Sequence, residues 1–244
     1  MNKIAKTNNL YKKSIRIALK KNRFCPFRYE KQMDFLFAEL KKDFSQGKPL
    51  KVLESGCGQG RLLYYLQKFD SRQNYFGLDY VKENVDYAKK LFCRESNIKI
   101  QKGNFYHFGN RQRKAFDLVI SYKTLSWLPE YKRAVKEMIR VAKDKVYITS
   151  LFYDGDISFE IKVNNLNQKC FNYLNVYSTN EFRKFCLKNG AKKVTFHYMK
   201  LDIDLPKPTN PNDITTYTVR ARDGENMEIT GVVLLNWKLV IVQL

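Results

Sequence analysis

Three glycines at alternate positions follow a short apolar run in the stretch Lys51–Leu63. Gly56, Gly58 and Gly60 stand between this run and a pattern typical of a helix. Glycine allows a positive φ and lets a ligand approach the main chain. The helix that follows begins with unpaired N–H groups and a positive dipole end, which suits a carboxylate or phosphate group. The stretch therefore predicts either a ligand-binding turn or a packing turn of an α/β fold.

An acidic residue ends the next apolar run. Asp79 closes the run Tyr75–Asp79 and follows Gly60 by 19 positions. Nucleotide-binding folds place a carboxylate at about this distance, where it accepts hydrogen bonds from ribose hydroxyls. Capping of the next helix is the alternative. The glycine spacing differs from the Gly-x-Gly-x-x-Gly of dinucleotide enzymes, and Glu54 would lie unfavourably beside a pyrophosphate.

The segment Glu54–Gly60, followed by Asp79, resembles the class I S-adenosylmethionine-dependent methyltransferases. Lys102–Phe105 is similar to the family's adenine-binding segment, and Phe116–Ser121 is similar to its fourth strand. The resemblance covers roughly residues 29–148. It implies S-adenosyl-L-methionine as cofactor and S-adenosyl-L-homocysteine as product. It implies cofactor contacts at Glu54, Gly56, Cys57, Gly58, Gly60, Asp79, Tyr80, Asn104, Phe105 and Ser121.

Strand and helix patterns alternate through residue 152, and two apolar runs end the chain. We expect an α/β, Rossmann-like class I methyltransferase fold, with a mixed seven-stranded sheet, helices on both faces and a terminal antiparallel hairpin. Thr179 is expected to cap the last helix. The expected single domain 1–244 divides into a basic arm and lid helices (1–48), a cofactor-binding core (49–152), a substrate insertion (153–178), and a C-terminal helix with antiparallel strands (179–244) that carries a long loop (205–230).

The five cysteines are scattered and do not have the spacing of metal ligands. No apolar run reaches the ~20 residues that span a bilayer. The amino terminus lacks the apolar core of a signal peptide. These features predict a cytoplasmic protein without a bound metal.

The net charge of +21 is unevenly distributed. Lys and Arg outnumber Asp and Glu by 33 to 14 in residues 1–150, but only by 12 to 10 in the rest of the chain. Such a field attracts nucleic acid, a phosphorylated metabolite, a nucleotide sugar or a membrane surface. A general lysine bias in composition is the alternative interpretation.

Substrate contacts are expected beside the cofactor. In the resembling family, a segment near Arg28 and Tyr29 folds over the cofactor, and both residues are candidates. Tyr122 and Tyr153 follow strands whose carboxyl ends face the site in this fold, and Asp154 is a candidate base. No catalytic residue is assigned. His107 and His197 are expected to be structural.

The motifs that the chain lacks exclude some classes of methyl acceptor. Ser121–Thr124 replaces the Pro-Pro motif of enzymes that methylate base amines. Asn175–Ser178, Asp202–Pro208, Thr216–Thr218 and Asn236–Trp237 look like bacterial methyltransferases found among genes for surface polysaccharides. That likeness implies O-methylation of a small, anionic, sugar-type acceptor. The alternatives are an RNA methyltransferase that uses the basic amino-terminal half and a non-catalytic cofactor-binding activator subunit.

Overall fold

The computed structural model describes residues 29–45, 47–109, 111–166, 170–200, 202–210, 215–222 and 224–244. The candidate contact Arg28 and residues 1–28 of the basic arm lie outside this part of the chain. None of the helices in these ranges is long and apolar enough to cross a bilayer.

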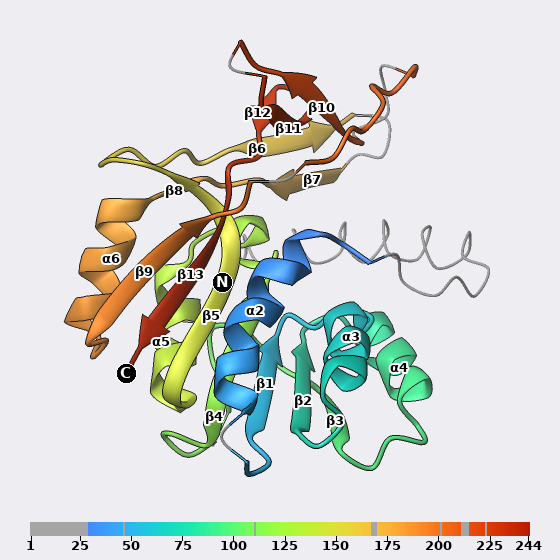
Figure 1. The fold of residues 1–244 in the computed structure, drawn as a ribbon, viewed down its shortest axis with the longest axis vertical. Helices are drawn as coiled ribbons and strands as arrows, with labels where there is room; N and C mark the ends of the chain where they lie inside the picture. The colour runs from blue at the N-terminus through green and yellow to red at the C-terminus, as the bar shows by residue number, and fades with distance from the viewer. Residues whose placement is uncertain are drawn as a thin grey trace.

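A central sheet organises the molecule (Figure 1). Its strands are β1 (Lys51–Ser55), β2 (Asn74–Asp79), β3 (Ile98–Lys102), β4 (Phe116–Tyr122), β5 (Ala142–Tyr153), β8 (Tyr177–Ser178), β9 (Lys193–Tyr198) and β13 (Trp237–Gln243). The helices are α2 (Gln32–Phe44), α3 (Arg61–Phe69), α4 (Lys82–Leu91), η1 (Leu125–Trp127), α5 (Lys132–Val141) and α6 (Thr179–Lys188).

The main path of the sheet runs β3-β2-β1-β4-β5-β13-β9. Strands β1 to β5 pair in parallel, and β13 is antiparallel to both of its neighbours. This confirms the expected mixed seven-stranded sheet and terminal antiparallel pair. The short strand β8 adds to β5 beside that path, which the sequence analysis missed.

Both faces of the sheet are covered (Figure 1). On one face, Val52, Ile120 and Tyr147 pack against apolar residues of α2 and α3. On the other, Leu53, Val119 and Ile148 pack against apolar residues of α5 and α6, whereas α4 lies on the first face, where Leu91 and Phe92 at its end join the cluster of α2 and α3. Strands that are buried on both faces have continuous apolar sequences, which is why β4 was recognisable.

The segments expected to be an insertion and a long loop contain additional strands. A hairpin of β6 (Lys162–Asn165) and β7 (Cys170–Tyr173) lies within the insertion. A small sheet of β10 (Thr216–Arg220), β11 (Asn226–Thr230) and β12 (Val233–Leu234) follows β9. The described residues of β10 and β11 are nearly all half-buried, so they lack the strict alternation that identifies a strand from sequence. The expected long loop therefore contains structure, and the last long strand of the chain begins at Trp237.

The N-cap of α6 lies one residue before the position predicted from the sequence. Ser178, not Thr179, is the N-cap, because its backbone is extended and its hydroxyl accepts a 3.0 Å hydrogen bond from the N–H of Glu181. We expect Ser178→Ala to lower the free energy of unfolding by about 1 kcal/mol. Urea denaturation measures this loss, and Thr179→Ala, the control, should cost less. An equal or larger loss in the control would contradict the assignment.

Candidate active site

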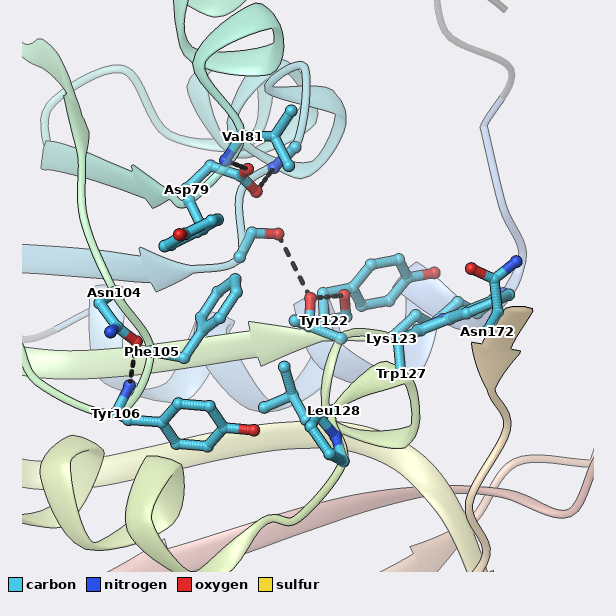
Figure 2. Close-up of a pocket in the computed structure, with 15 residues that line it drawn as sticks. Asp79, Val81, Asn104, Phe105, Tyr106, Tyr122, Lys123, Trp127, Leu128 and Asn172 are labelled. Atoms are coloured by element: carbon cyan, nitrogen blue, oxygen red, sulfur yellow. Dashed lines mark hydrogen bonds between the residues drawn. The ribbon is translucent and has the colours of Figure 1, made fainter. Parts of the chain in front are cut away.

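A cavity of about 270 Å³ opens at the carboxyl ends of the parallel strands. The chain proceeds from β1 toward β3 on one side and from β4 toward β5 on the other, and ligands bind at such a switch point. The cavity is lined by Gly56, Gly58, Asp79, Tyr80, Val81, Asn104, Phe105, Tyr106, Tyr122, Lys123, Thr124, Trp127, Leu128, Pro129 and Asn172. In Figure 2, Asp79 and Asn104 lie toward one end, and Lys123, Trp127 and Asn172 toward the other. We call the first end the cofactor half, because its residues are among those expected from the sequence to contact the cofactor, and the other end the acceptor half.

The glycine turn forms one wall of the cofactor half. Gly56 has φ +86°, and a Cβ there would lie 2.4 Å from Oγ1 of Thr124. Gly58 has φ +53°, and a Cβ there would meet nothing within 4 Å. Because Gly58 lines the cavity, that open space is available to a ligand that approaches the main chain.

Asp79 presents a nearly buried carboxyl group to the same half. Its two oxygens accept hydrogen bonds from the N–H groups of Gly58 (2.9 Å) and Val81 (2.8 Å). Burial raises the pKa of Asp79, although these two N–H groups oppose the shift. Oδ1 also accepts a long hydrogen bond (3.4 Å) from the side-chain amide of Asn84, whereas Oδ2 keeps a further lone pair for a ligand.

Asn104 and Phe105 form the far wall of the cofactor half. The side-chain carbonyl of Asn104 accepts a 2.9 Å hydrogen bond from the N–H of Tyr106 (Figure 2). This bond fixes the orientation of the amide and leaves one carbonyl lone pair for a ligand amine.

Four residues expected at the cofactor lie outside the cavity lining. Glu54 and Cys57 are buried, and burial raises the pKa of both groups, so the neutral forms are favoured. One oxygen of Glu54, Oε2, has no hydrogen-bond partner among the described residues. Gly60 is the N-cap residue of α3 and packs against Phe92, and Ser121 is buried within β4.

Lys123 begins the acceptor half with a left-handed backbone, φ +51°. Its ammonium group lies 2.9 Å from a carboxylate oxygen of Glu30 and 4.8 Å from the centroid of the Trp237 ring. Glu30 also pairs with Arg61 and accepts a 2.9 Å hydrogen bond from the hydroxyl of Tyr122. The start of α2 is thereby attached to the end of β4.

The hydroxyl of Tyr122 acts as a donor here. Burial, followed by the charge of Glu30, raises the pKa of Tyr122 far above its ordinary value. The phenol therefore stays protonated and donates to Glu30, so it is unsuited to remove a proton from a substrate.

Of the described substrate candidates, Tyr122 lines the cavity and the others do not. Tyr29 donates a hydrogen bond to Asp34, Tyr153 packs on Phe159, and Asp154 pairs with Lys238. The acceptor half instead contains Lys123, Trp127 and Asn172, none of which was singled out from sequence. In the sequence, the one indication that Trp127 lies near the site is its position five residues after the end of β4.

The ion pairs of Glu30 predict a pH-dependent contribution to stability. Although burial raises the pKa of Glu30, Lys123 and Arg61 hold it below the ordinary value of 4.5. A carboxyl group with a lowered folded-state pKa stabilises the fold above its unfolded pKa, and this contribution is lost as the pH falls through the folded-state value. Glu30→Gln should therefore cost about 1.5 kcal/mol at pH 7 and less near pH 3.

Urea denaturation at the two pH values measures this difference. Glu39→Gln is the control, because the Glu39 side chain is as exposed as that of Glu30 (22%) but pairs only within its own helix, with Lys42. An exposed pair of this kind contributes about 0.3–0.5 kcal/mol. A loss for Glu30→Gln that is the same at both pH values would contradict the role of the ion pairs.

Residues 53–149 match the family model described as "Methyltransferase domain". The matched residues make up less than half of the chain. No curated protein matches the chain significantly.

Solved structures with similar folds are numerous. The YcgJ protein of Bacillus subtilis has a TM-score of 0.54 at 15% identity, over 86% of this chain and 98% of that one. A complex of a Haloferax volcanii methyltransferase activator with a putative methyltransferase has a TM-score of 0.55 at 17% identity, over 84% of this chain and 87% of that one. The magnesium protoporphyrin IX methyltransferase ChlM of Synechocystis PCC 6803 was solved with bound S-adenosylmethionine. It has a TM-score of 0.51 at 16% identity, over 87% of this chain and 78% of that one.

At these identities the likeness shows the fold, which is the Rossmann-like α/β fold of class I methyltransferases. Together with the matched methyltransferase domain, it supports S-adenosylmethionine as the cofactor of this site. The expected fold is confirmed.

Proposed function

We propose that the protein is an S-adenosylmethionine-dependent methyltransferase that uses this cavity. The observation that carries the proposal is the glycine turn beside Asp79. Open space lies at Gly58, and the Asp79 carboxyl group, which keeps an accepting lone pair on Oδ2, lines the same cavity. This arrangement suits a ligand with a ribose diol, and the matched methyltransferase domain contains both residues.

Each half of the cavity has a separate task in this proposal. The Asp79 carboxyl group would hold the ribose, Asn104 and Phe105 the adenine, and the main chain at Gly56 and Gly58 the amino-acid end. When bound, the cofactor would supply an electrophilic methyl group to the acceptor oxygen, and its sulfur would keep the electron pair of the bond to that methyl group. The residues of the acceptor half would orient that oxygen, which is the main contribution that a protein makes to such a displacement. The hydroxyl proton is released to solvent.

The finer part of the proposal concerns the acceptor, a small sugar, nucleotide sugar or phosphate-type precursor of a bacterial surface glycan. Two of the carboxy-terminal segments that resemble glycan-associated methyltransferases, Asn175–Ser178 and Asn236–Trp237, contact the acceptor half. Asn175 donates a 2.9 Å hydrogen bond to the carbonyl of Leu128, and the ring of Trp237 lies below the Lys123 ammonium. These contacts support the idea that the carboxy-terminal half determines the acceptor.

Transfer of labelled methyl groups tests the proposal. The purified protein is incubated with methyl-labelled S-adenosylmethionine and either a bacterial small-molecule extract rich in nucleotide sugars or total RNA, with heat-denatured protein as background. We expect label in the low-mass pool. Label in RNA, with binding that weakens steeply as salt rises, would overturn the acceptor class. Tight cofactor binding without transfer to either pool would favour a non-catalytic subunit.

A further inference from the structure

Trp127 is an exposed aromatic ring on a cavity wall. It lines the acceptor half, yet 43% of its surface is exposed, whereas Trp237 is 7% exposed. Tryptophan is a large apolar residue that is usually well buried. A tryptophan that remains accessible inside a cavity offers a flat apolar face to a ligand.

The turn that carries this ring is fixed on the side of the sheet. The buried hydroxyl of Ser126, the residue before Trp127, lies 2.6 Å from the hydroxyl of Ser150 in β5. The same oxygen accepts a 3.2 Å hydrogen bond from the N–H of Leu151. Buried polar groups that are satisfied in this way give a segment a single conformation.

The insertion fixes the same turn from a second side. The N–H of Asn175 donates to the carbonyl of Ser126 (2.9 Å), and its side-chain amide donates to that of Leu128 (2.9 Å). The hydroxyl of Tyr177 donates to the carbonyl of Leu125 (2.8 Å). The backbone around Trp127 is therefore held by buried groups from two elements, while the ring stays accessible, which is the arrangement of a preorganised binding surface.

The surroundings of the ring combine apolar and polar groups. Leu128 and Pro129 continue the apolar wall, and Asn172 of β7 lines the same half of the cavity (Figure 2). The ion pair of Lys123 with Glu30 lies at the end of β4 beside them. A pyranose ring fits such a surface, because its axial C–H groups form an apolar face while its hydroxyl groups point outward from the ring edge.

We propose that Trp127 is the stacking platform for a hexopyranose ring of the acceptor, with the amide of Asn172 as a hydrogen-bonding partner of its hydroxyl groups. This inference rests on the proposed methyl transfer to a glycan precursor and assigns the residue that selects the sugar. A flat platform favours a pyranose over an acyclic polyol or a free phosphate of similar size.

The fluorescence of Trp127 tests the platform directly. The chain has two tryptophans, so Trp237→Phe leaves Trp127 as the single tryptophan, which is excited selectively at a wavelength that tyrosine hardly absorbs. With S-adenosylhomocysteine at saturation, the probes are UDP-glucose, UDP-galactose and GDP-mannose, against UDP, GDP and sorbitol. We expect at least one sugar-bearing probe to shift the emission to shorter wavelength and to lower acrylamide quenching at least twofold. The nucleotides and the polyol should do neither.

Two further variants separate stacking from structure. Trp127→Ala should weaken binding of the responding probe at least tenfold, measured by calorimetry, and Trp127→Phe should retain most of it. Both should bind S-adenosylhomocysteine as the unsubstituted protein does. Phe159→Ala is the matched control, because Phe159 is equally exposed (43%) but does not line the cavity.

The outcomes distinguish this inference from the proposed function. Cofactor binding without any response of Trp127 to the sugar-bearing probes would overturn the platform and leave the methyltransferase proposal standing. A response to UDP equal to that to UDP-glucose would also overturn it, because the nucleotide and not the sugar would then contact the ring. Absence of S-adenosylhomocysteine binding by the folded protein would overturn the proposed function itself.

Discussion

Asp79→Ala is expected to lower the affinity for S-adenosylmethionine by about 100-fold. Two hydrogen bonds from ribose hydroxyls to a carboxylate contribute roughly 1.5 kcal/mol each, and 1.4 kcal/mol corresponds to a factor of ten in affinity. The substitution also removes the acceptor of the N–H groups of Gly58 and Val81, which shape the turn. Calorimetric titration with S-adenosylhomocysteine measures the loss.

The control for this prediction is Asp86→Ala. Asp86 is an exposed carboxylate on α4, the helix that follows Asp79, and it pairs with Lys82 away from the cavity. Its replacement should leave cofactor affinity within a factor of two and stability nearly unchanged, because an exposed ion pair contributes little. Equal affinities for Asp79→Ala and the unsubstituted protein would show that this carboxyl group does not hold the cofactor.

Gly58→Ala should lower cofactor affinity at least tenfold while the fold is retained. The methyl group would meet no protein atom within 4 Å, so it would occupy space that the cavity offers to a ligand. The positive φ of this residue adds a strain of about 1–2 kcal/mol to the folded state. Cofactor affinity is measured by calorimetry and the strain by thermal unfolding.

Gly47→Ala separates the two effects. Gly47 also has a positive φ, +84°, and a Cβ there would meet nothing within 4 Å, but it lies before β1 and does not line the cavity. Both variants should lose similar stability, and only Gly58→Ala should lose cofactor affinity. If the two variants bind the cofactor equally well, the turn does not approach the ligand as we propose.

The cofactor half was predictable from sequence because its parts follow recognisable strands. Gly58, Asp79 and Asn104 each come within a few residues of the end of an apolar run, and the carboxyl ends of parallel strands meet at one edge of a sheet. Local pattern and global fold agree in this half, so short-range reasoning found residues that the structure brings together.

The acceptor half depends on contacts that no local pattern encodes. Glu30 forms an ion pair with Lys123 although the two residues are 93 positions apart in sequence. Asn172 lines the cavity from a hairpin within the insertion. Lys123 has a left-handed backbone, which a sequence usually signals by a glycine; because a lysine stands there, the turn could not be predicted. Tyr153 and Asp154 were favoured because they follow a strand, but β5 continues to Tyr153, beyond the cavity, and Asp154 pairs with Lys238.

Titration of the purified protein with S-adenosylmethionine tests the central claim most directly. The account predicts one binding site per chain, competition by S-adenosylhomocysteine, no binding of NAD, and loss of the signal in Asp79→Ala but not in Asp86→Ala. A folded protein that binds neither S-adenosylmethionine nor S-adenosylhomocysteine would contradict it, as would binding that is unchanged by Asp79→Ala.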